Sequence, residues 1–80
     1  MEFEKHFLTE DFARLNNEIN IMHRSSLNTI DCSLNGDMYH AELAAHQVLK
    51  SLQVVKALNA KKIVRDDHER HAMAVRRSYF

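Results

Sequence analysis

Residues 33–38 read SLNGDM and contain the only glycine of an 80-residue chain that has no proline. Glycine and proline are the residues that most strongly interrupt helices, so the chain has almost nowhere else to turn. Gly36 suits the position just beyond the end of a helix, and Asp37 can cap the helix that follows. The sequence therefore predicts an all-α fold, an antiparallel helical hairpin that turns at Asn35-Gly36-Asp37.

Before the turn, apolar residues recur at alternating three- and four-residue steps, which is the spacing of a heptad seam. The seam consists of Phe12, Leu15, Ile19 and Met22. Thr9 is the predicted N-cap of this helix. The seam falters at Ser25-Ser26, so the helix is expected either to bend there or to end near Arg24. It resumes on a rotated line that holds Leu27, Ile30 and Leu34. Residues 2–8 are expected to dock on the second helix as an extra turn or arm.

After the turn, a strongly helical segment carries an apolar stripe that starts with alanines and becomes bulkier. The stripe holds Ala41, Ala45, Val48, Leu52 and Val55, widened by Ala44, Leu49 and Leu58. An unbroken helix over residues 38–80 would be about 64 Å long, more than the first helix can cover. Asp66 and Glu69 have the spacing of a capping box. We therefore expect either a short third C-terminal helix that begins near Arg65 or a long continuous second helix.

The composition is that of one small folded domain over residues 1–80. Apolar residues make up 45% of the chain and charged residues 28%, with a formal net charge of zero. The helices carry more apolar side chains than one hairpin can hide, so we expect dimerisation to complete a bundle. The lone Cys32 excludes an intrachain disulfide and fits a reducing, cytoplasmic compartment. No apolar run is long enough to span a membrane.

Motifs of enzymes are missing from the sequence. It has no glycine-rich phosphate loop, no nucleophile elbow and no zinc-protease helix motif. Its serines, cysteine and carboxylates are scattered, whereas catalysis needs such groups in a fixed mutual geometry. We therefore expect a non-enzymatic protein with no catalytic residue, no cofactor and no small-molecule substrate.

Charge is distributed unevenly along the chain. Residues 1–49 hold three basic and eight acidic side chains, and residues 50–80 hold eight basic and three acidic ones. A basic half favours nucleic-acid binding as an alternative function, and its candidate residues are Lys61, Lys62, Arg76 and Arg77. A hairpin offers a simpler explanation, because it places the acidic N-terminus beside the basic half and neutralises both. The expected pairs join Glu2, Glu4, Glu10 and Asp11 to Lys61, Lys62, Arg65 and Arg70.

Six histidines are many for a short chain, and two pairs have the helical spacing of a shared metal site. The pairs are His68 with His71 and Glu42 with His46. Metal sites in bundles draw their ligands from several facing helices, whereas these pairs lie far apart along one helix. We therefore expect solvent-facing histidines and no metal. Their protonation between about pH 5 and 7 would make the protein cationic and would loosen an oligomer.

The turn at residues 35–37 and the terminal Arg76-Arg77-Ser78-Tyr79-Phe80 carry a likeness that covers the whole chain. A helical hairpin of this length, whose second helix runs to a terminal aromatic residue, resembles the needle subunits of type III secretion systems. The resemblance implies a self-assembling structural subunit. This chain differs from that family because its turn has no proline and its C-terminal end is basic and rich in histidine.

The favoured interpretation is a small regulator or adaptor that binds another protein through helical faces, as a homodimer. The seam expected in the core or the dimer interface consists of Phe12, Leu15, Ile19, Met22, Val48, Leu52 and Val55. Aromatic residues and arginine dominate interface energetics, so the last turn is the expected partner site. Its residues are Arg76, Arg77, Tyr79 and Phe80. The identity of the partner is not encoded in these residues.

Overall fold

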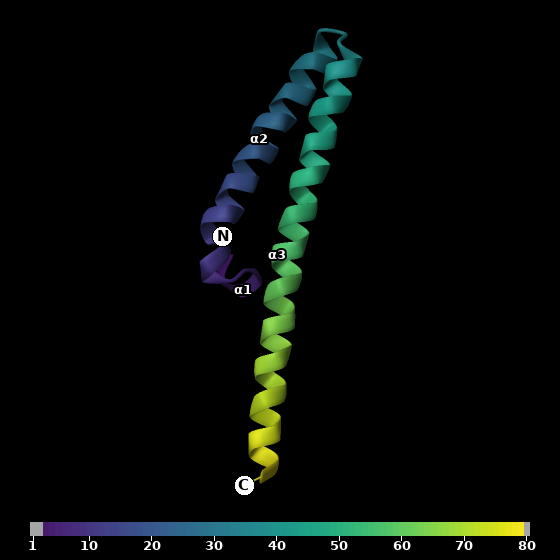
Figure 1. Cartoon of the computed structure of the whole chain (residues 1–80). Coiled ribbons are helices and arrows are strands. Elements are labelled where there is room, and N and C mark those ends of the chain that lie inside the picture. Colours follow the sequence, from purple (N-terminus) through teal and green to yellow (C-terminus); the bar gives the residue numbers. More distant parts are fainter. Residues whose placement is uncertain (1–2, 80) are drawn as a thin grey trace.

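The computed structural model describes the backbone of residues 3–79 and the side chains of residues 3–70. It contains a one-turn helix α1 (Phe3–His6), a 3₁₀ turn η1 (Thr9–Asp11) and two long helices, α2 (Phe12–Leu34) and α3 (Met38–Tyr79). The described residues contain no strand, so the predicted all-α class is confirmed. Figure 1 shows α2 and α3 side by side as an antiparallel hairpin, with α3 continuing alone to the C-terminus. The molecule measures 67 × 18 × 15 Å.

The turn between the long helices has the hydrogen bonds of a Schellman motif. The N–H of Asp37 donates to the carbonyl of Cys32 (2.9 Å), and the N–H of Gly36 donates to that of Ser33 (3.2 Å). Gly36 has a φ of +75°, in the left-handed region that glycine enters without steric cost. Asp37 then caps α3, because its Oδ1 accepts the backbone N–H of His40 at 3.2 Å. The predicted roles of Gly36 and Asp37 are confirmed.

The two helices meet along a line of mostly small and medium side chains. On α2 this seam holds Leu15, Met22, Ser25, Thr29 and Cys32, and on α3 it holds Ala41, Val48, Ser51, Val55 and Leu58. Ser51 is only 1% exposed, and its Oγ accepts a hydrogen bond from Gln47 Nε2. Leu52, which the sequence placed in the stripe, is 42% exposed. Ser51 takes the buried place next to Leu52 within the hairpin, and the predicted place of Leu52 in a dimer interface stays a prediction.

The remaining seam predictions agree better with the structure. Leu15 is fully buried. The other predicted members that lie in the hairpin are half-buried, namely Phe12, Ile19, Met22, Val48 and Val55. These residues are therefore part of the contact between α2 and α3, or border it.

Helix α2 runs without interruption through Ser25-Ser26, so the predicted end near Arg24 is wrong. The small buried Ser25 continues the seam instead of breaking it. Beyond it, Thr29 Oγ1 donates to the carbonyl of Ser25 at 2.8 Å, which satisfies the hydroxyl inside the helix. Thr9 is not the N-cap, since α2 begins after the 3₁₀ turn and its N-cap is Asp11. Neither that residue nor the cap of the 3₁₀ turn makes a side-chain capping bond.

Helix α3 is continuous over 42 residues, or about 63 Å. The long continuous second helix is therefore confirmed, and the short third helix beginning near Arg65 is wrong. Asp66 does not cap a new helix; its Oδ1 accepts a hydrogen bond from Lys62 Nζ at 2.8 Å. This ion pair joins residues four apart and supports helical continuity across the predicted break.

The N-terminal segment folds back as an arm on α3, as expected. Asn59 Nδ2 of α3 donates to the carbonyl of His6 at 3.0 Å. The rings of Phe3 and Phe12 meet edge to face with centroids 6.2 Å apart. Leu8, between α1 and η1, is buried. The arm closes the open end of the hairpin and covers α3 near Asn59.

Candidate protein-interaction surfaces

Ion pairs join the acidic N-terminal segment to α3 at the open end of the hairpin. Lys61 Nζ lies 3.2 Å from Asp11 Oδ1 and 3.4 Å from Glu10 Oε1. Arg65 Nη1 lies 3.0 Å from the same Glu10 oxygen. The hydrogen bond to Asp11 raises the pKa of Lys61, with a further contribution from Glu10. The predicted neutralisation of the basic half by the N-terminus is confirmed for these two cations.

Two other cations proposed to pair with the N-terminus pair within α3 instead. Lys62 bonds Asp66, and Arg70 Nη2 lies 3.6 Å from Asp67 Oδ1. They lie on α3 turns where an acid three or four residues away is the nearer partner. The two described lysines of the nucleic-acid alternative, Lys61 and Lys62, are thus both held by carboxylates.

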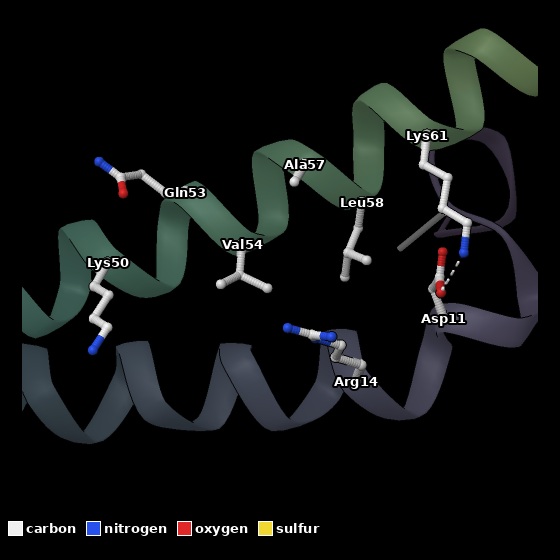
Figure 2. Close-up of a pocket in the computed structure, with 8 residues that line it drawn as sticks. All are labelled: Asp11, Arg14, Lys50, Gln53, Val54, Ala57, Leu58 and Lys61. Carbon is white, nitrogen blue, oxygen red and sulfur yellow. Dashed lines mark hydrogen bonds and ion pairs between the residues drawn. The ribbon is translucent and has the colours of Figure 1, made fainter.

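A polar groove lies on one side of the seam between α2 and α3 (Figure 2). Its volume is about 640 Å³, and it is lined by Asp11, Arg14, Lys50, Gln53, Val54, Ala57, Leu58 and Lys61. Asp11 is buried at one end of this groove, and its Oδ2 has no hydrogen-bond partner among the described residues. Arg14 and Lys50 reach toward the groove from opposite helices. This side of the hairpin therefore carries four charged residues, Asp11, Arg14, Lys50 and Lys61, around apolar ones.

An apolar groove lies between α2 and α3 nearer the turn. Its volume is about 470 Å³, and its lining residues are Ser26, Thr29, Ile30, Ala45, Val48 and Leu49. Ile30 and Leu49 flank it with 58% and 55% of their surfaces exposed. Helical spacing places this groove on the opposite side of the seam from the polar one. The hairpin thus has one charged side and one apolar side.

Further large apolar side chains are exposed along the hairpin. Besides Ile30, Leu49 and Leu52, they are Leu27, Leu34, Met38, Tyr39, Leu43, Ile63 and Val64. Leu27, Ile30 and Leu34 form the rotated line noted in the sequence, and the structure leaves that line outside the hairpin core. For Ile30, Leu49 and Leu52, the sequence signal is an apolar residue one position after a seam residue.

The partner site predicted at the last turn lies largely outside the described side chains. Arg76, Arg77 and Tyr79 belong to the final turns of α3, where only the backbone is described, and Phe80 lies outside the described residues. Their helical backbone extends from the open end of the hairpin, beyond α1 (Figure 1). Their predicted role stays a prediction.

Among the described residues, no group of three or more histidine, cysteine, aspartate or glutamate side chains could hold a metal ion. The one described histidine–carboxylate pair joins His40 Nδ1 to Asp37 Oδ2 at 2.7 Å. The backbone and side-chain bonds from His40 lower the pKa of Asp37. The side chain of His71 lies outside the described residues. The contact between His40 and Asp37 is therefore part of the N-terminal cap of α3.

None of the helices over the described residues is long and apolar enough to cross a bilayer. No protein-family model matches the chain, and the search for similar curated proteins and similar solved structures found no match. The surfaces of this hairpin are therefore the features that bear on its function.

Proposed function

We propose that the chain is a small, non-enzymatic regulator or adaptor that binds another protein through exposed faces of α3, as a homodimer. The observation that supports this proposal is the length of α3, which extends beyond the N-terminal segment that packs against it. Among the described ion pairs, Arg65 is the last α3 residue joined to the N-terminal segment, yet the helix continues to Tyr79. We call residues 66–79 the overhang.

An isolated helical segment of this length is marginal in water, because most helical stability in proteins comes from packing of one face. Val64 lies where the cover ends and is 67% exposed. A helix laid into the apolar groove of a partner would bury such residues at spacings of three and four. Arg76 and Arg77 would then face an acidic rim, and Tyr79 and Phe80 would supply aromatic anchors.

A site-specific photo-crosslinker at position 64 tests this proposal in cells that produce the protein. We expect a discrete crosslinked protein at position 64 and none at Gln53, an exposed position on the polar groove that serves as the control. The captured protein is then purified and titrated with the full chain. Val64→Asp and Arg77→Glu are each expected to weaken that complex by about tenfold or more. Equal binding by both variants and the wild type would refute the proposal.

Two alternatives predict different results. A nucleic-acid binder would bind oligonucleotides with an affinity that falls steeply with salt. The carboxylate partners of Lys61 and Lys62 weigh against this alternative, since phosphate binding needs unpaired positive charge. A needle-like subunit would grow without limit in light scattering, whereas a dimer stops at two copies.

A further inference from the structure

The exposed apolar residues of α3 form a second heptad seam beside the one that packs against α2. We call this line the outer seam; its residues are Met38, Glu42, Ala45, Leu49, Leu52, Lys56, Asn59 and Ile63. They alternate at four- and three-residue steps, as the two core positions of a coiled coil do. Five of them, Glu42, Leu49, Leu52, Lys56 and Asn59, follow a seam position by one residue, so the outer seam is rotated by about 100° around the helix.

The large apolar residues of the outer seam are exposed in the described structure, whereas Asn59 is half-buried and donates to the carbonyl of His6 in the arm. Met38, Leu49, Leu52 and Ile63 are all large, apolar and exposed. Ala45 and Leu49 also line the apolar groove with Ile30 of α2. The seam spans 25 residue steps, or about 38 Å, which is enough for three heptads of packing.

Charge along the outer seam indicates what covers it. Glu42 lies seven residues before Leu49, and Lys56 lies seven residues after it, so opposite charges lie on the two sides of an apolar centre. Two copies in a parallel arrangement would place Glu42 against Glu42 and Lys56 against Lys56. Two antiparallel copies related by a two-fold axis between Leu49 and Leu52 place Glu42 opposite Asn59 of the other copy, with Lys56 of that copy three residues (about 4.5 Å) further along the same interface.

We infer that the outer seam is the interface with a second copy of this chain, packed antiparallel with the two-fold axis between Leu49 and Leu52. This inference rests on the proposed function and specifies its dimer. In this register Leu49 opposes Leu52 of the other copy, and Met38 opposes Ile63. The amide of Asn59 already donates to His6 within its own chain. The two hairpins together form a four-helix arrangement whose charged grooves face solvent.

Sedimentation equilibrium of the purified full chain tests the interface. We expect a wild-type dimer, and Leu49→Asp/Leu52→Asp raises its dissociation constant more than about 100-fold, because each copy loses two buried leucines and buries two carboxylates. Leu43→Asp is the matched control, since Leu43 is a comparably exposed leucine of α3 outside the outer seam. It is expected to leave the dimer intact. A monomeric wild type, or a dimer insensitive to the double variant, overturns the inference.

Charge reversal tests the antiparallel register without disturbing the apolar core. Glu42→Lys and Lys56→Glu are each expected to weaken the dimer about tenfold, because each places like charges together twice per dimer. Glu42→Lys/Lys56→Glu is expected to restore it. If the double reversal fails to restore the dimer, the antiparallel register is wrong. Growth beyond two copies also overturns the two-fold interface.

The two proposals fail separately. A wild-type monomer that still binds its partner through position 64 refutes the homodimer and leaves the adaptor function standing. A dimer with the expected charge-reversal behaviour that binds no partner refutes the adaptor function alone.

Discussion

Gly36 is the one described residue with a positive φ, and nothing lies within 4 Å of the position where a Cβ would stand. The requirement for glycine is therefore one of backbone conformation and not of space. A residue with a Cβ in this conformation crowds its own carbonyl, and asparagine tolerates it better than alanine.

We expect Gly36→Ala to lower the free energy of unfolding by about 1 kcal/mol, and Gly36→Asn by less. Urea titrations at one fixed protein concentration measure both, because self-association makes stability depend on concentration. If the two substitutions lower the free energy of unfolding equally, the left-handed backbone at Gly36 is not the cause of the loss.

Asp37 has a second, pH-dependent role as the cap of α3. Its pKa is lowered by bonds from His40, so its carboxylate stabilises the fold above the ordinary aspartate pKa. That contribution is lost as the pH falls through the lowered value. Asp37→Asn is expected to lower Tm at pH 7, and the difference from wild type is expected to shrink as the pH falls through the lowered pKa of Asp37. Asp31→Asn, a control in the last turn of α2, should show no such loss.

The pairing of α2 with α3 depends on side-chain size as much as on hydrophobicity. Leu15 is fully buried in the seam, whereas Leu34, also on α2, is 82% exposed. Small residues such as Ser25 and Ser51 let the helices come close in between. The position of a leucine relative to the seam therefore decides its contribution.

Leu15→Ala is expected to destabilise the protein by about 3 kcal/mol, because it leaves a cavity in the seam. Leu34→Ala changes the same atoms at an exposed site and is expected to cost less than about 0.5 kcal/mol. Thermal or urea unfolding measures both. Similar losses for the two variants would contradict the assigned seam.

The all-helical hairpin was predictable because one glycine and no proline left a single turn, and local chemistry at Gly36 and Asp37 decides that turn. The line of packing was less predictable. A pattern of large apolar residues does not reveal that Ser51 replaces Leu52 in the seam, since that choice depends on the distance between the helices. The break expected near Arg65 failed because the Lys62–Asp66 pair supports the helix where a capping pattern suggested its end. The apolar groove was not predictable, since it needs both helices in register.

The whole molecule is a rod in which α3 extends beyond the segments that pack against it. The overhang, residues 66–79, continues α3 past the arm and the open end of the hairpin (Figure 1). Its described side-chain pairs join residues of the same helix. Backbone hydrogen bonds in such a segment open locally at little cost.

Hydrogen exchange is therefore expected to divide α3 into two parts. Amides of residues 70–79 should exchange at least about tenfold faster than those of residues 44–58 in the isolated protein. Addition of the partner protein should slow exchange of the amides of residues 70–79 only. Equal protection of both sets in the isolated protein would mean that the overhang is already covered.

The hairpin contains contacts of very different sequence separation, and this separation affects the order in which they form. The Schellman bond joins Cys32 to Asp37, whereas the bond between Asp11 and Lys61 joins residues 50 apart. Loop-closure entropy favours the short contacts first, so the chain should nucleate at the turn and fold outward toward its termini.

In stopped-flow chevrons, Gly36→Ala should mainly slow folding, and Leu58→Ala near the open end should mainly speed unfolding. A chain that folds outward from its middle orders both termini last, so the end that we propose to bind a partner would be the final part to gain packing support.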